Sequence, residues 1–337
     1  MAREEKCRLL VNLPSGFFRC PQLKGVFARL GRLAVLRKRS HNKAEEIEKD
    51  LAWADAVLMW AWPVLSRELL ARCPRLRFAG HINIVQASAK AELEHGLVVS
   101  EARHGWSPAV AELALGLILC GLRRISDYHA AMRAGTEHWV SDFPVDIDPL
   151  ERQLAGRAVG IVGFGAIGRR LAELLEPFRV HLRVYDPYVP RVVAERLGGK
   201  LVPLADLVKN SEVVVLCAAN NPGTKHLLGR REIAALPRNA LLVNVGRAWL
   251  VDMDALVRRL EKGDLFAALD VFDTEPLPLD SPLRKLPNAW LTPHRAGAPI
   301  ESVVRILNML ADDLEAFLQG RELKYPLTME MLHALPG

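Results

Sequence analysis

The stretch VGIVGFGAIGRR, residues 159–170, decides the fold of the second half of the chain. An apolar, strand-like run leads into Gly163, Gly165 and Gly168, and an amphipathic helical pattern, RRLAELLEPF, overlaps its end. In this order the glycines permit a tight turn, close approach of the backbone to a pyrophosphate, and close packing of the helix on the strand. The stretch predicts a dinucleotide-binding α/β domain.

An acidic residue follows the next strand-like run, which ends at Asp186. A carboxylate there can accept hydrogen bonds from the adenosine ribose hydroxyls and repels a 2′-phosphate, so NAD is favoured over NADP. The phosphates are expected at the first amides of the helix. The residues predicted to contact the cofactor at this place are Gly163, Gly165, Ala166, Ile167, Gly168 and Asp186.

Short apolar runs alternate with amphipathic stretches in two series. The first covers residues 7–100, and the second begins at residue 157 and ends near residue 294. Such alternation is typical of mostly parallel sheets with helices on both faces. The sequence therefore predicts an α/β protein with two doubly wound parallel-sheet domains. An amphipathic pattern over residues 300–318, ended by Gly320, predicts a last long helix.

The chain has 337 residues and a formal net charge of +6. Its most basic stretch, Arg29–Lys43, lacks interleaved aromatic residues and a nucleic-acid motif, and we interpret it as a solvated face. No nucleic-acid partner is expected. A mildly basic surface suits small anionic substrates.

The five cysteines are scattered, with no C-x-x-C pair and no histidine at metal-ligand spacing, so we expect reduced thiols and no metal site. The N-terminus mixes both charges ahead of a short apolar run, unlike a secretory signal. The uncharged apolar run Leu113–Leu122 is too short to span a bilayer. A cytoplasmic protein without a membrane partner is predicted.

A serine–proline pair, Ser107 and Pro108, predicts the start of a long helix that ends at Gly135. Because this helix is apolar almost all round, we expect it to be buried between domains or against a second subunit. Trp139, in the connector that follows, is expected to be buried as well; the alternative is that it lines the cleft.

Three strand-like runs of the second series are followed by chemically useful residues: Arg247, then Asp270 and Glu275, then His294. Ligands bind at the carboxyl ends of such strands. Each residue alone would be taken for a surface charge or a structural histidine. Together they suit the reduction of a 2-oxo acid: arginine binds the carboxylate, histidine supplies a proton to the oxygen, and glutamate favours the charged imidazole.

With these motifs the chain resembles the D-isomer-specific 2-hydroxyacid dehydrogenase family, over almost its whole length. The resemblance implies a Rossmann NAD-binding domain, residues 103–296, inserted into a flavodoxin-like substrate domain, residues 1–102 and 297–337. It implies that Arg247 holds the carboxylate and 2-oxygen, that His294 is the acid/base, that Glu275 is its partner, and that Asp270 bonds the nicotinamide carboxamide. It also implies a homodimer formed through the helix after Ser107.

The chain departs from that family in the loop that usually grips the substrate carboxylate through backbone amides. A glycine-containing A-G-V-G-V-D-N loop is customary there, and this chain reads GHINIVQ, residues 80–86. We expect His81, Ile82 and Asn83 to contact the substrate, narrowing its pocket or adding polar contacts. The alternative is that the loop repacks and His81 points away.

The predicted function is NAD-dependent hydride transfer between nicotinamide and a small 2-oxo acid or D-2-hydroxy acid. One alternative is a dehydrogenase for phosphite or another small anion on the same scaffold; Glu275 argues against formate, because formate dehydrogenases carry glutamine there. Another is a corepressor-like protein that senses NAD(H), which the lack of Pro/Ser-rich tails disfavours.

Overall fold

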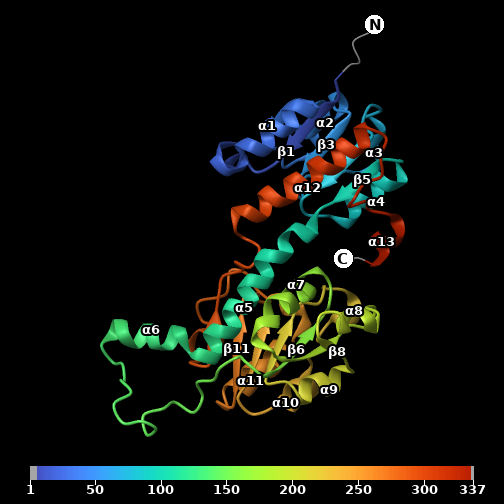
Figure 1. Ribbon diagram of the computed structural model, residues 1–337. Helices are drawn as coiled ribbons and strands as arrows, with labels where there is room; N and C mark the ends of the chain where they lie inside the picture. The colour runs from blue at the N-terminus through green and yellow to red at the C-terminus, as the bar shows by residue number, and fades with distance from the viewer. Residues whose placement is uncertain (1–5, 335–337) are drawn as a thin grey trace. The chain divides into compact units, whose positions relative to one another are not determined.

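The computed structural model describes residues 6–334, which form two compact units (Figure 1). Unit 1 comprises residues 6–106 and 299–334, and unit 2 comprises residues 107–298. Unit 1 is thus built from both ends of the chain, with unit 2 as the intervening segment. The substrate and cofactor roles assigned to domains with similar boundaries remain predictions.

Unit 1 contains a parallel sheet of five strands in the order β2-β1-β3-β4-β5. This is the flavodoxin-like order, as predicted. Its strands are β1 (Arg8–Asn12), β2 (Val35–Arg39), β3 (Ala56–Met59), β4 (Phe78–His81) and β5 (Val98–Glu101).

Helices cover both faces of this sheet, because its central strands are apolar on both sides. One face packs against α1 (Lys24–Leu33) and the last long helix, α12 (Ile300–Leu318). The other packs against α2 (Ala44–Trp53), α3 (Arg67–Ala71), α4 (Gln86–Glu94) and α13 (Met329–Ala334). Short 3₁₀ turns are η1 (Ser15–Arg19), η2 (Pro21–Leu23) and η3 (Arg103–Trp106).

Unit 2 contains a parallel sheet of seven strands in the order β12-β11-β10-β9-β6-β7-β8. The strand order reverses between β6 and β9, as in a Rossmann domain. The strands are β6 (Ala158–Val162), β7 (His181–Tyr185), β8 (Gly199–Leu201), β9 (Val213–Leu216), β10 (Ala240–Asn244), β11 (Leu265–Leu269) and β12 (Ala289–Leu291).

The apolar core of unit 2 lies between this sheet and its helices. On one face α5 (Ser107–Arg123) packs against α7 (Ala166–Leu175), β10 and β11. A cluster of buried apolar residues in unit 2 also includes residues of α9 (Leu204–Lys209), α10 (Arg230–Ala235) and α11 (Met253–Leu260). The remaining elements are α8 (Arg191–Glu195), η4 (Glu176–Phe178), η5 (Pro222–Thr224), η6 (Ala248–Leu250) and η7 (Pro282–Lys285).

The single helix predicted from Ser107 to Gly135 is wrong, because the chain breaks it at Arg124. That residue has a left-handed φ of 49°, and its guanidinium pairs with Asp127 and Asp148. A second helix, α6 (Ile125–Ala134), follows and ends at Gly135, but it contains no buried residue. The expectation that this whole segment and Trp139 are buried is also wrong, since Trp139 is 70% exposed.

The segment Arg103–Arg123, mostly α5, is long and apolar enough to cross a membrane by length and composition alone. More than half of its most apolar window, 56%, is buried inside the structure. A core helix passes the same test, and the packing of α5 on α7 and the sheet gives it that position here.

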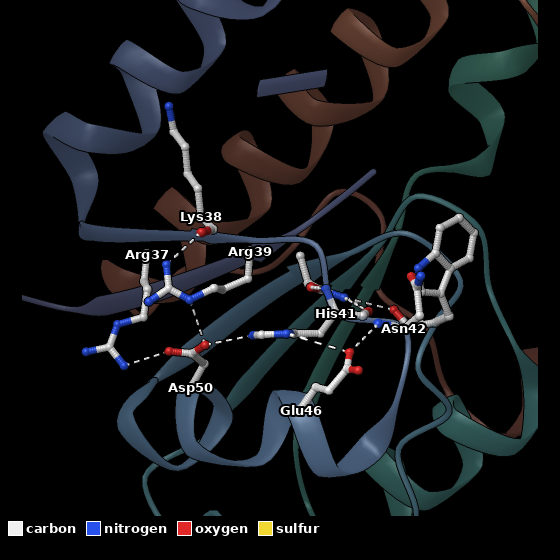
Figure 2. A network of polar contacts seen from close by, with 9 residues as sticks. Arg37, Lys38, Arg39, His41, Asn42, Glu46 and Asp50 are labelled. Carbon is white, nitrogen blue, oxygen red and sulfur yellow. Dashed lines mark hydrogen bonds and ion pairs between the residues drawn. The ribbon is translucent and has the colours of Figure 1, made fainter. Parts of the chain in front are cut away.

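The basic stretch, residues 29–43, includes edge strand β2. Figure 2 shows Arg37, Arg39 and His41 directed at the carboxylate of Asp50, each at 2.8 Å. Burial by itself would raise the pKa of Asp50, but the hydrogen bonds from His41, Arg37 and Arg39 lower it. Charged side chains on an edge strand also discourage pairing with other chains. These three basic residues therefore connect the edge strand β2 and the loop after it to Asp50 on α2.

Candidate active site

Three neighbouring strands of unit 2 bring the predicted chemical groups to one edge. Arg247 follows β10, Glu275 follows β11, and His294 follows β12, and these strands are adjacent in the sheet. Because the strands are parallel, their carboxyl ends lie at the same edge, where ligands bind in doubly wound sheets.

Arg247 is exposed, and a buried asparagine shapes the turn that carries it. The Asn244 side chain donates from Nδ2 to the Arg247 carbonyl at 2.9 Å and accepts from the Gly246 amide at 3.1 Å. The Arg247 guanidinium donates to the Gly246 carbonyl at 2.7 Å. Among the described residues this is its only hydrogen-bond partner, so most of its donors remain available. Sequence reasoning missed Asn244, although a polar residue ending an apolar strand was a usable signal.

The His294 imidazole and the Glu275 carboxylate form a direct contact, with Nδ1 and Oε2 2.6 Å apart. The other oxygen of Glu275 accepts from the Phe272 amide at 3.0 Å, which fixes the carboxylate. Within residues 6–334, Nε2 of His294 has no hydrogen-bond partner. The side chain of His294 is 45% exposed, so this nitrogen can meet a ligand.

Burial by itself would raise the pKa of Glu275. The hydrogen bonds from His294 and from the Phe272 amide, together with the positive charges of His294 and Arg247, outweigh burial and lower it. Arg247 therefore acts electrostatically on the same carboxylate that holds His294. The arrangement keeps a negative charge beside the imidazole.

Asp270 is fully buried and organises the loop that carries His294. Its Oδ1 accepts from the Thr292 hydroxyl at 2.6 Å and the Arg295 amide at 2.7 Å, and its Oδ2 accepts from the Ala296 amide at 2.9 Å. The Asp270 carbonyl also accepts from the His294 amide. These contacts account for the carboxylate as an anchor of the loop. The hydrogen bond expected between Asp270 and a nicotinamide carboxamide remains a prediction. Thr292 was missed by sequence reasoning.

The glycine stretch has the local geometry that a nucleotide phosphate requires. Gly163 has φ +90°, and a Cβ there would lie 2.4 Å from the backbone of Ala218. A Cβ at Gly168 would lie 2.3 Å from the Gly163 carbonyl oxygen, so helix and turn pack closely. At Gly165 nothing lies within 4 Å of the added atom, which leaves the open approach that a pyrophosphate needs.

The helix that follows offers its first amides to such a phosphate. Helix α7 begins at Ala166, with Ile167 in its first turn, and its N-cap residue Gly165 supplies no side-chain hydrogen bond. The Asp186 carboxylate accepts from the Phe164 amide at 2.8 Å and from the Tyr188 amide at 2.9 Å. Asp186 thus lies beside the glycine turn, and each of its oxygens retains further accepting capacity for a ribose hydroxyl. The residues present fit NAD.

The loop predicted to contact the substrate, in unit 1, lies differently from the expectation. The imidazole of His81 is 1% exposed, and its Nε2 lies 2.7 Å from Oε2 of Glu92, which is fully buried. Ile82 is also buried, whereas Asn83 is partly exposed. Direct side-chain contact of His81 and Ile82 with a substrate is therefore not supported; of the three, only Asn83 offers its side chain. The alternative, that the loop repacks with His81 pointing inward, fits.

The described residues contain no group of three or more His, Cys, Asp or Glu that could hold a metal ion. The five cysteines are all free thiols. Burial raises the pKa of the Cys217 thiol to about 12 and, as the main cause, that of Cys7 to about 11, so neither is a nucleophile near neutral pH.

Comparison with known proteins agrees with this geometry. The family model of the D-isomer specific 2-hydroxyacid dehydrogenase, NAD binding domain, matches residues 115–296. A glyoxylate reductase from Aeropyrum pernix is 32% identical over 274 residues, which cover 80% of this chain and 81% of that protein. A D-3-phosphoglycerate dehydrogenase from Methanocaldococcus jannaschii is 31% identical over 82% of this chain. The match covers 52% of that relative, so the chain spans about half its length.

A solved structure of a phosphoglycerate oxidoreductase from Rhizobium etli superposes with a TM-score of 0.78 at 30% identity, covering 95% of this chain and 98% of that one. These three proteins are named a reductase, a dehydrogenase and an oxidoreductase. Their names favour neither the oxidation of phosphite or another small anion nor a corepressor-like role. The chain therefore belongs to the D-isomer specific 2-hydroxyacid dehydrogenase family and is an NAD-dependent oxidoreductase acting on CH–OH groups.

Proposed function

We propose that this protein reduces a small 2-oxo acid to the D-2-hydroxy acid with NADH, and catalyses the reverse oxidation with NAD. The observation that carries the proposal is the 2.6 Å contact between His294 and Glu275 at the same sheet edge as Arg247. The nicotinamide supplies or accepts the hydride. Residues 159–170 and Asp186 hold the nucleotide, with Asp186 selecting NAD over NADP.

His294 donates a proton from Nε2 to the oxygen that becomes the hydroxyl group. Glu275 holds the ring by Nδ1, which leaves Nε2 directed to the ligand and stabilises the charged imidazolium. Arg247 binds the carboxylate and the 2-oxygen through its planar guanidinium, whose donors match two acceptors at once. Asp270 contributes by fixing the His294 loop. We assign substrate binding to unit 1, including Asn83 and the backbone of the loop 82–85.

A homodimer is part of this proposal. Eight large apolar side chains between residues 125 and 147 are exposed: Ile125, Tyr128, Met132, Trp139, Val140, Phe143, Val145 and Ile147. In Figure 1, α6 and the connector after it project from the body of unit 2. So many exposed apolar side chains in one segment point to an interaction site, and a second copy of this chain is the occupant that the resemblance implies. We further expect the enzyme in the cytoplasm.

The function is tested by mixing purified protein with NADH and a panel of 2-oxo acids while following nicotinamide absorbance. We expect turnover with NADH well above that with NADPH, and a product of D configuration on chiral chromatography. Light scattering on the same sample should give twice the chain mass. Absence of turnover with every 2-oxo acid would overturn the proposal, and turnover on phosphite or formate would then favour the alternative function.

A further inference from the structure

The carboxyl edge of the sheet in unit 1 carries a cluster of large aromatic rings. The cluster consists of Phe17, Trp60, Trp62 and Trp106, and each ring lies in a segment that follows a strand: Phe17 after β1, Trp60 and Trp62 after β3, and Trp106 after β5. Ligands of doubly wound sheets bind outside this edge. The aromatic cluster therefore lies where unit 1 would contact a substrate.

Trp60 is the centre of the aromatic cluster. Its ring centroid is 5.4 Å from that of Phe17, 6.1 Å from that of Trp62 and 6.1 Å from that of Trp106. The rings are partly buried, and three of them pack on the apolar core beneath, so their positions are fixed while part of their surface stays open. Fixed aromatic surface binds apolar groups with little loss of conformational entropy.

The two central loops beside the aromatic cluster contain no charged residue. Residues 60–66, after β3, read WAWPVLS, and residues 82–85, after β4, read INIV. A phosphate group on a substrate would need arginine, lysine or several amide donors. The cations of the flanking segments are largely engaged elsewhere: Arg37, Arg39 and His41 pair with Asp50, and Arg103 pairs with Glu101. Arg19, at the end of η1, is exposed. The edge is therefore suited to an apolar group and poorly suited to a phosphate.

The Asn12 side chain, fully buried at the end of β1, holds this edge in shape. It donates to the carbonyls of His41 and Trp62, both at 3.0 Å, and accepts from the His41 amide at 2.8 Å. These bonds tie the loop of Trp62 to the loop after β2. The apolar edge is thus a built surface and not a flexible loop that happens to contain tryptophans.

We propose that the aromatic cluster binds the side chain of the substrate, and that the enzyme prefers 2-oxo acids with a large apolar side chain, aromatic or branched, over glyoxylate, hydroxypyruvate and phosphorylated acids. This proposal rests on the proposed function, since it names the substrate class of the same reaction. Trp60 is its specificity-determining residue.

The test compares kcat/KM for phenylpyruvate, 4-methyl-2-oxopentanoate, pyruvate, glyoxylate and 3-phosphohydroxypyruvate, with NADH, in the wild type and in Trp60→Ala and Trp60→Leu. We expect phenylpyruvate to exceed pyruvate by at least roughly tenfold, the scale on which hydrophobic pockets discriminate. Either Trp60 variant should reduce that ratio by about tenfold or more, while pyruvate turnover changes far less. The matched control is Trp53→Leu, since Trp53 lies on α2 under the Arg37 guanidinium.

The outcomes separate the two proposals. A preference for glyoxylate or 3-phosphohydroxypyruvate, or an equal loss for all acids in both Trp60 variants, overturns the substrate class and leaves 2-oxo acid reduction standing. Turnover of none of the acids overturns the proposed function itself. If Trp60→Ala does not fold, Trp60→Leu, which keeps an apolar side chain, measures the same ratio.

Discussion

Two histidine–glutamate pairs in this protein have almost the same nitrogen–oxygen distance, but one pair is exposed and the other is buried. His294 and Glu275, in unit 2, are 2.6 Å apart and 45% and 35% exposed. His81 and Glu92, in unit 1, are 2.7 Å apart and 1% and 0% exposed. The first pair can exchange protons with a ligand and with water, whereas the second is sealed in the interior.

The difference also extends to the ring nitrogen that each glutamate binds. Glu275 binds Nδ1 of His294 and leaves Nε2 to the outside, as a proton donor requires. Glu92 binds Nε2 of His81 and leaves Nδ1 buried without a hydrogen-bond partner. The buried pair joins the end of β4 to α4 and so brackets the loop 82–85. We infer that the same chemistry serves proton transfer in one place and loop positioning in the other.

The largest expected effect breaks the exposed pair. His294→Ala should lower kcat for reduction by ~10³-fold, within the range found for a positioned general acid, because no other described side chain at this edge replaces Nε2. Affinity for NADH should stay nearly unchanged, since the proposed nucleotide contacts lie at residues 159–170 and Asp186. Steady-state kinetics and fluorescence titration with NADH measure the two quantities.

The matched control is His181→Ala, because His181 is exposed at the first residue of β7, at the amino edge of the same sheet. It should retain wild-type kcat. Equal losses in both variants would contradict the assignment of His294.

The second prediction breaks the buried pair. His81→Leu leaves the Glu92 carboxylate without its partner in the interior, which should lower the free energy of unfolding by about 3 kcal/mol. The double variant His81→Leu/Glu92→Met removes both polar groups and should recover most of that loss, because an apolar pair of similar size avoids the desolvation cost. Chemical denaturation followed by fluorescence measures both. A double variant less stable than the single one would show that the pair acts through more than its mutual contact.

The sequence predicted the two sheets because their strands are apolar runs bounded by glycines and polar turns, and this pattern is local. It also singled out both residues of the exposed pair, since Glu275 and His294 each follow a strand; their catalytic roles remain predictions. It did not predict Asn244 or Thr292. A polar residue that ends an apolar strand was a usable signal for Asn244, whereas the bond from Thr292 to the Asp270 carboxylate depends on which two strand ends the fold brings together. It missed the break at Arg124 because the helical pattern continues through it, and the ion pair with Asp148 comes from a distant segment.

The buried pair shows the same limit. His81 stands where a small residue is customary, and sequence reasoning could place it toward the substrate or away from it. The choice depends on which face of α4 points inward, and Glu92 lies on that face. A lone glutamate within a short helical pattern gives no sign of this.

The third prediction tests the exposed pair through the pH dependence of catalysis. Glu275→Gln should lower kcat for reduction at every pH, by less than the ~10²–10⁴-fold of a general acid, because the amide can still orient the ring but carries no charge. The pKa of Glu275 is lowered from 4.5, so its carboxylate stays ionised until the pH falls through a still lower value. The acid limb due to this group should therefore lie below pH 4.5 in the wild type and be absent in Glu275→Gln. Profiles of log kcat/KM against pH, with circular dichroism to monitor folding, decide it.

The smallest expected effect is the pH dependence of the buried pair. Burial by itself would lower the pKa of His81, but the charge and hydrogen bond of Glu92 and the charge of Glu101 outweigh burial and raise it above 6.5. A histidine whose pKa is raised by folding stabilises the protein fully below the pKa of the unfolded chain, and this contribution decreases as the pH rises through the folded value. As the pH rises from 6.5, the wild type should therefore lose stability relative to His81→Leu/Glu92→Met. Denaturation midpoints of both proteins across that range measure the shift, and a difference that stays constant with pH would mean that the buried imidazole does not titrate with folding.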